Sequence, residues 1–118
     1  VRPDFVVDVT PPDVHHHVTL TALGKGVPVI GEKPMANSMQ EAREMVAASE
    51  RSGKLYMVSQ SRRYIGRQAQ FRHLVQETIG GAGIANVDFS IGAHFGGFRD
   101  EMESVLLLDM AIHTFDQI

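Results

Sequence analysis

Two short groups of residues in this sequence have the types and spacing that acid–base chemistry requires. The first is Glu32-Lys33-Pro34, which closely follows the apolar run at residues 27–30. Proline keeps the backbone of the preceding lysine extended, so an ammonium group is held near the end of a predicted strand, where it can hydrogen-bond a substrate hydroxyl and favour its alkoxide form. The second is Asp109 and His113, which are four positions apart and share one face of a predicted helix. A carboxylate beside an imidazole can orient the ring for proton transfer near neutral pH.

Both groups also have an ordinary structural interpretation. The Glu32-Lys33-Pro34 tripeptide is also typical of a plain surface turn, and its Lys-Pro peptide bond can be trans or cis. The pair Asp109 and His113 can equally be a solvated pair or a buried pair with satisfied hydrogen bonds. Spacing alone does not separate these interpretations from the chemical one.

Other polar residues follow the remaining predicted strands. Thr10-Pro11 and His15 come after the first strand, and ligands of open α/β sheets bind at the carboxyl ends of strands. Arg62 and Arg63 come after the third strand and can bind a phosphate or carboxylate, or form ordinary ion pairs. The run His15-His16-His17 contains three metal-binding side chains, but consecutive residues point in different directions on a helix. We therefore expect no metal site.

The elements that would position these residues alternate between short apolar runs and helical patterns. Asp13 is a candidate N-cap of the first helix, which Gly24 ends. Ser38 and Glu41 match a capping box at the start of the second helix, and Gly53 ends it. The predicted strands cover residues 5–10, 27–30 and 55–58. This strand–helix–strand–helix–strand order predicts a doubly wound parallel sheet in an α/β fold.

The second half of the sequence has a different pattern. A helix is predicted over residues 66–77. Between residues 87 and 95, apolar residues alternate with polar or small ones, which predicts a half-exposed strand of an antiparallel sheet. A final helix is predicted from Ser104 to the end of the chain. We expect two domains, residues 1–60 and residues 61–118, the second being the start of an α+β domain. The alternating residues are Val87, Phe89, Ile91, Ala93 and Phe95, and the apolar stripe expected to anchor the final helix is Val105, Leu108, Ile112 and Phe115.

Composition excludes several classes of protein. The 118 residues are 43% hydrophobic and 21% charged, with a net charge of -3 and no basic stripe, so we expect neither a nucleic acid nor a membrane partner. The absence of cysteine excludes disulfides and thiolate chemistry. No apolar run approaches the roughly 20 residues of a membrane span, and no signal peptide opens the chain, so we expect a cytoplasmic protein. The first residue, Val1, and the helical pattern at the last residues indicate an internal part of a longer chain.

Taken in order, these residues resemble the family of glucose–fructose oxidoreductase, inositol dehydrogenase and rhizopine catabolism proteins (Gfo/Idh/MocA). The tripeptide is weak evidence by itself, but followed about eighty positions later by an Asp-x-x-x-His helix it is much more specific. The resemblance covers nearly the whole chain. The matching segments are Thr10-Pro11 with His15, Gly24-Lys25-Gly26-Val27, Glu32-Lys33-Pro34-Met35-Ala36, Arg62-Arg63, and Leu108 to His113 with Asp116.

The resemblance implies a fold and a reaction. The first domain would be the second half of a Rossmann domain, and the second would begin the sheet domain that carries the substrate site and the oligomer interface, so we expect a homo-oligomer. Hydride would pass between NAD or NADP and a sugar, polyol or related hydroxyl. His113 would be the general base, Lys33 would flank the reacting hydroxyl, and Asp109 would position substrate or imidazole. The residues implied near the cofactor are Thr10, Pro11, His15, Glu32, Lys33, Pro34 and Arg63.

The sequence departs from the family pattern at two places. The Gly-x-Gly-x-x-Gly phosphate loop and the acidic residue that binds the adenosine ribose are absent, so we expect these 118 residues to be inactive alone. Residues 103–107 replace the glycine triplet often found before the catalytic aspartate, which leaves the substrate class open. The alternatives are a non-catalytic relative that senses a dinucleotide or sugar, and a different family chemistry such as glycoside cleavage or imine reduction.

Overall fold

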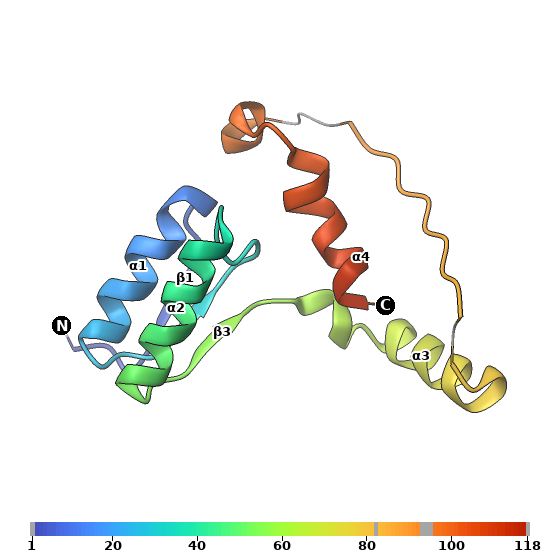
Figure 1. Cartoon of the computed structure of the whole chain (residues 1–118), viewed down its shortest axis with the longest axis horizontal. Coiled ribbons are helices and arrows are strands. Elements are labelled where there is room, and N and C mark those ends of the chain that lie inside the picture. The colour runs from blue at the N-terminus through green and yellow to red at the C-terminus, as the bar shows by residue number, and fades with distance from the viewer. Residues whose placement is uncertain (1, 82, 93–95, 118) are drawn as a thin grey trace. The chain divides into compact units, whose positions relative to one another are not determined.

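A computed structural model describes residues 2–81, 83–92 and 96–117 of the chain. The chain divides into two compact units, Val1–Ser59 and Gln60–Ile118, and each is described by itself. Figure 1 shows the order of the elements along the chain. None of the helices in the described ranges is long and apolar enough to cross a membrane.

The first unit contains a three-stranded parallel sheet and two helices. Strands β1 (Val6–Asp8), β2 (Val29–Gly31) and β3 (Tyr56–Val58) lie in the order β1-β2-β3. Helix α1 (Pro12–Gly24) connects the first two strands and α2 (Met39–Ser52) connects the last two, as parallel neighbours require a crossover. The predicted parallel sheet of an α/β fold is therefore confirmed, with strands shorter than the apolar runs that predicted them.

The helix ends follow local sequence signals, with one exception. Ser38 caps α2 by accepting a hydrogen bond from the Glu41 amide at 3.2 Å, and Gly53 ends that helix in the left-handed conformation with a φ of 62°. The prediction that Asp13 caps α1 is wrong, because Pro11 is the N-cap and Pro12 begins the helix. Proline already has the φ angle of a first helical turn. Asp13 lies in that turn, where its negative charge interacts favourably with the positive end of the helix dipole.

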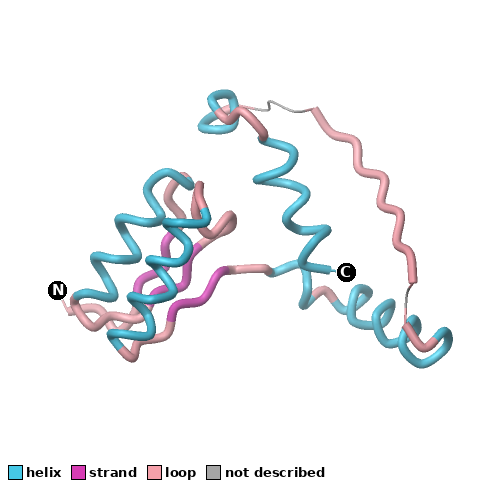
Figure 2. Tube along the Cα trace, viewed as in Figure 1, coloured by secondary structure: helices cyan, strands magenta, loops and turns pink. Residues whose placement is uncertain are grey.

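The core of the first unit lies between its helices and one face of the sheet. Leu23 and Val29 are almost completely buried and pack with Ala22 and Ala48. Both helices lie over the same side of the strands (Figure 2). The opposite side of the sheet remains uncovered and carries exposed apolar residues, namely Phe5, Val7, Val9, Leu55 and Met57.

The second unit is helical and extended. It contains η1 (Ser61–Tyr64), α3 (Gly66–Ile79), η2 (Gly97–Glu101), the π-helix η3 (Leu106–Ala111) and α4 (Ile112–Gln117). The strand predicted over residues 87–95 is wrong for residues 87–92, which form no β-ladder; Ala93, His94 and Phe95 lie outside the described residues. A strand needs a hydrogen-bonded neighbour, and no second strand lies among the described residues of this unit, so Val87 and Phe89 stay about half exposed.

The final helix is not the regular α-helix that the sequence predicts. Its first part, η3, is a π-helix, which is wider than an α-helix and rotates the following side chains away from ideal spacing. Val105 is buried as expected and Ile112 is half-buried, but Leu108 is 37% exposed and Phe115 is 68% exposed, so the predicted apolar stripe is wrong at these last two positions. Asp109 and His113 are buried instead.

Candidate functional site

The carboxyl edge of the sheet gathers most of the residues predicted to bind ligand. Strands β1 and β2 end at Asp8 and Gly31, and the Glu32 amide donates to the Asp8 carbonyl oxygen at 2.9 Å. On the other side of β2, the Ser59 amide donates to the Gly31 carbonyl oxygen at 2.7 Å. The chain therefore leaves β2 fixed on both sides, directly before Lys33.

The turn itself, Glu32-Lys33-Pro34, is closely constrained. The Lys33–Pro34 peptide bond is cis. The Lys33 amide donates to the Glu32 carboxylate at 3.2 Å, while Glu32 and Lys33 are half-buried and Pro34 is buried. The lysine is thus attached to a defined turn at the sheet edge where ligands of α/β folds bind.

His15 connects this turn with the loop that follows β1. Its side chain is 2% exposed. Ring nitrogen Nδ1 lies 2.9 Å from the carbonyl oxygen of Pro34, and Nε2 lies 2.8 Å from the carbonyl oxygen of Thr10. His15, Thr10 and Pro34, three of the predicted site residues, are therefore joined directly.

Thr10 is in turn fixed by Asp8, which is 2% exposed. One carboxylate oxygen, Oδ1, accepts from the Thr10 amide at 3.1 Å and from the Thr10 hydroxyl at 2.6 Å. The other oxygen, Oδ2, is buried and has no hydrogen-bond partner within the described part of the chain. Nearby on β3, burial raises the pKa of the Tyr56 hydroxyl to about 12, so it stays protonated near neutral pH.

The other two histidines of the triplet lie in different surroundings. His16 Nε2 lies 2.8 Å from a carboxylate oxygen of Glu44 on α2, and Gln40 donates to the other oxygen at 3.1 Å. The hydrogen bonds from Gln40 and His16 lower the pKa of the Glu44 carboxyl. His17 is exposed. Over residues 2–81, 83–92 and 96–117, no three His, Asp or Glu residues are grouped to hold a metal ion.

In the second unit, Asp109 forms a buried ion pair that the sequence did not predict. Asp109 is 1% exposed, and Arg99 of η2 donates from Nε to its Oδ2 at 2.8 Å. The Arg99 guanidinium also lies 4.5 Å from the ring centroid of Phe98, a cation–π contact. A buried carboxylate needs a compensating charge or hydrogen bonds. Arg99 is a basic residue ten positions before Asp109, and this was the only signal in the sequence that could have identified it as the partner.

Two further predicted residues lie on or beside α4. His113 is 8% exposed within α4. Arg63 of η1 forms a two-pronged ion pair with Asp116, with 3.0 Å between Nε and Oδ2. The Arg63 hydrogen bond holds the pKa of the Asp116 carboxyl below its usual range. The guanidinium predicted to meet the cofactor is therefore engaged by a carboxylate of its own unit.

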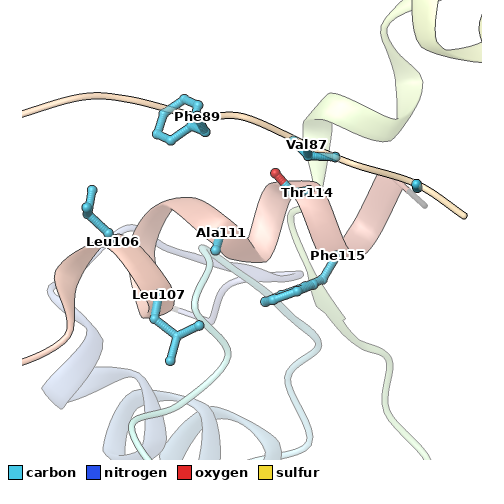
Figure 3. A pocket seen from close by; sticks show the side chains of 8 residues that line it. Val87, Phe89, Leu106, Leu107, Ala111, Thr114 and Phe115 are labelled. Atoms are coloured by element: carbon cyan, nitrogen blue, oxygen red, sulfur yellow. The ribbon is translucent and has the colours of Figure 1, made fainter.

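An apolar cleft in the second unit lacks groups for acid–base chemistry. It is lined by the extended residues 85–89 and by the helix of η3 and α4, and Figure 3 shows Leu106 and Thr114 on the side of that helix nearer to Val87 and Phe89. Thr114 supplies its only side-chain hydroxyl among the lining residues. The cleft is an apolar surface, and the polar candidates are the carboxyl edge in the first unit and the buried Asp109 and His113 in the second.

The start of α1 bears on where a dinucleotide phosphate could bind. Phosphates bind at helix N-termini through free backbone N–H groups. The first helix opens with Pro11 and Pro12, and proline has no N–H group. The carboxyl edge therefore offers hydroxyl-binding groups, Glu32 and Lys33, rather than a phosphate loop.

Comparisons with known proteins agree with this architecture. Residues 1–60 match the model of the Gfo/Idh/MocA family, described as an oxidoreductase family with an NAD-binding Rossmann fold. An NAD-binding protein from Listeria innocua is similar in fold, with a TM-score of 0.73 and 24% identity over 97% of this chain and 35% of its own.

Two relatives extend the similarity across both units. D-apiose dehydrogenase from Paraburkholderia graminis is 31% identical over 96% of this chain and 31% of its own length. 1,5-anhydro-D-fructose reductase from Ensifer adhaerens is 29% identical over 98% of this chain and 36% of its own length. The chain thus spans about a third of the length of these relatives. The resemblance found in the motifs is confirmed, and the chain belongs to the Gfo/Idh/MocA oxidoreductase family with its NAD-binding Rossmann fold.

Proposed function

We propose that the full-length protein containing this chain transfers hydride between NAD or NADP and a hydroxyl carbon of a sugar or polyol. The observation that carries the proposal is the attachment of Lys33 to a fixed turn at the carboxyl edge of the parallel sheet. The relatives named as a D-apiose dehydrogenase and a 1,5-anhydro-D-fructose reductase support a sugar substrate. We assign residues 1–60 to the cofactor domain and residues 61–118 to the start of the substrate domain.

The carboxyl edge fits the nicotinamide-ribose part of such a cofactor. Glu32 is a half-buried carboxylate that can accept hydrogen bonds from ribose hydroxyls, and Lys33 can donate to them. The carboxylate oxygen Oδ2 of Asp8 is buried beneath this edge and has no hydrogen-bond partner among the described residues, so it adds a polar group to the site. The residues we propose to line the cofactor site are Thr10, Pro11, Glu32, Lys33, Pro34 and Arg63, with His15, which is 2% exposed, supporting them from beneath without touching the cofactor. The cofactor itself would accept or donate the hydride.

We propose three residues for the reaction. Lys33 donates a hydrogen bond to the reacting hydroxyl and stabilises negative charge on its oxygen. His113 accepts the hydroxyl proton as general base, for which imidazole is well suited near neutral pH. Asp109, neutralised in part by Arg99, orients the imidazole or the substrate.

Both units expose apolar surfaces that could be covered by other parts of the full-length protein or by a second copy of it. We propose a homo-oligomer, because the sheet face at Val7 and Met57 and the cleft of the second unit both expose apolar side chains. We also propose a cytoplasmic location and no nucleic acid or membrane partner, since the net charge is -3 without a basic stripe.

The test is a turnover assay of the full-length protein with NAD and with NADP on a panel of sugars and polyols. We expect reduced cofactor to form with at least one of them, and the variant His113→Asn to lower kcat by about 10²- to 10⁴-fold, the usual contribution of acid–base catalysis. The matched control is His17→Gln, because His17 is exposed on α1. Cofactor binding without turnover on any panel member would contradict the enzyme proposal and favour a sensing relative.

A further inference from the structure

The buried member of the histidine triplet has an unusual pair of partners. Both ring nitrogens of His15 lie within 2.9 Å of a backbone carbonyl oxygen, that of Pro34 and that of Thr10. A carbonyl oxygen can only accept, so each nitrogen must carry a proton to form its bond. A neutral ring has one N–H and can donate to one of the two oxygens, whereas a doubly protonated ring donates to both.

The two carbonyl groups depend on His15 to different degrees. Thr10 is also held by Asp8 through its amide and its hydroxyl. Pro34 has no backbone N–H, so its carbonyl oxygen is the one backbone group through which a hydrogen bond can fix it. The bond to Pro34 is therefore the one whose loss would free the turn.

The Pro34 bond completes a bracket around Lys33. On one side, the Glu32 amide is tied to the Asp8 carbonyl oxygen at 2.9 Å. On the other side, the Pro34 carbonyl is tied to His15. The backbone from which the lysine projects is thus fixed one residue before and one residue after it, and both ties lead to residues at the carboxyl end of β1 or the start of α1.

We propose that His15 is a positioning residue for Lys33, acting through the hydrogen bond from Nδ1–H to the Pro34 carbonyl oxygen rather than by touching the cofactor or substrate. This inference rests on the proposed catalytic role of Lys33. Displacement of a catalytic group by about 1 Å can reduce turnover on the order of 10²-fold, so the bond has a kinetic consequence beyond its contribution to stability.

Two amide variants separate the two bonds. The side-chain nitrogen of asparagine lies about where Nδ1 of histidine lies, and that of glutamine lies about where Nε2 lies. His15→Asn therefore keeps a donor for Pro34, and His15→Gln keeps a donor for Thr10. In the full-length protein we expect kcat to stay close to that of the wild type for His15→Asn and to fall on the order of 10²-fold for His15→Gln. The dissociation constant of the cofactor should change little in either variant.

The controls distinguish this inference from a structural role and from failure of the proposed function. His17→Gln should leave kcat unchanged because His17 is exposed. Equal kcat values for the two His15 variants, or values that simply follow their melting temperatures, would overturn the inference. If Lys33→Met retained wild-type turnover, the proposed role of Lys33 would fail, and this inference with it, although the protein would still be a dehydrogenase; if Lys33→Met lost turnover while the two His15 variants behaved alike, only this inference would fail.

A measurement on the unmutated protein covers the case in which a variant does not fold. Nitrogen-15 NMR of histidine-labelled full-length protein reports which ring nitrogens carry protons. We expect a protonated Nδ1 at His15, identified by its proximity to Pro34. An unprotonated Nδ1 would overturn the inference.

Discussion

The two units of this chain differ in how completely they bury the residues that their sequences mark as apolar. In the first unit, Leu23 and Val29 are enclosed between two helices and a sheet. In the second, Leu107 and Phe115 remain more than half exposed, and the buried positions include Asp109 and His113. The first unit is stabilised mainly by an apolar core, whereas the second holds its polar residues through specific ion pairs.

The largest effect should come from deleting core atoms in the first unit. Leu23→Ala removes a side chain that is 1% exposed and leaves a cavity, so we expect a loss of about 3 kcal/mol of unfolding free energy. Leu107→Ala, at a side chain that is 56% exposed, should cost less than about 0.5 kcal/mol in the same chain. Denaturant unfolding, followed by amide exchange in α1 and α4, measures the loss of unfolding free energy in each variant. Similar losses in the two variants would contradict the contrast between the units.

The sequence predicted the first unit well because its signals are local. Ser38 and Gly53 mark the ends of α2 by hydrogen bonding and backbone conformation that neighbouring residues alone determine. The alternation at residues 87–91 is also a local signal, but a strand forms only beside another strand, and none lies among the described residues of the second unit. The same reasoning explains the site: the turn at Lys33 was predictable, whereas the bonds of His15 and the partner Arg99 depend on chain segments brought together by folding.

The second largest effect should come from removing an ion pair in the second unit. Arg99→Met removes the guanidinium that donates to Asp109 at 2.8 Å, and we expect a loss of about 2 kcal/mol, typical of a hydrogen bond to a charged group. Arg67→Met on α3 is a matched control at an exposed position and should cost less than about 0.5 kcal/mol. Amide exchange in α4 reports the difference, which should vanish if the Arg99 pair does not stabilise this unit.

The smallest effect is a pH dependence of the pair between Arg63 and Asp116. Arg63 lowers the folded-state pKa of the Asp116 carboxyl from its ordinary value of 3.8, so the pair contributes stability above that value and loses it as the pH falls through the lowered folded pKa. The melting temperatures of wild type and Arg63→Met should therefore differ near neutral pH and converge in acid. The difference should be small and decrease with salt, because the Arg63 side chain is 44% exposed. A gap that stayed constant as the pH was lowered from neutral into the acid range would contradict this assignment.

The central claim, that the turn after β2 carries a catalytic lysine, is tested most directly by Lys33→Met in the full-length protein. Methionine keeps the length of the side chain and removes its charge and its donors. We predict that kcat falls about 10²- to 10³-fold, whereas the dissociation constant of the nicotinamide cofactor rises no more than about tenfold, the effect of losing one hydrogen bond. Turnover close to that of the wild type, with the cofactor bound equally well, would contradict the account.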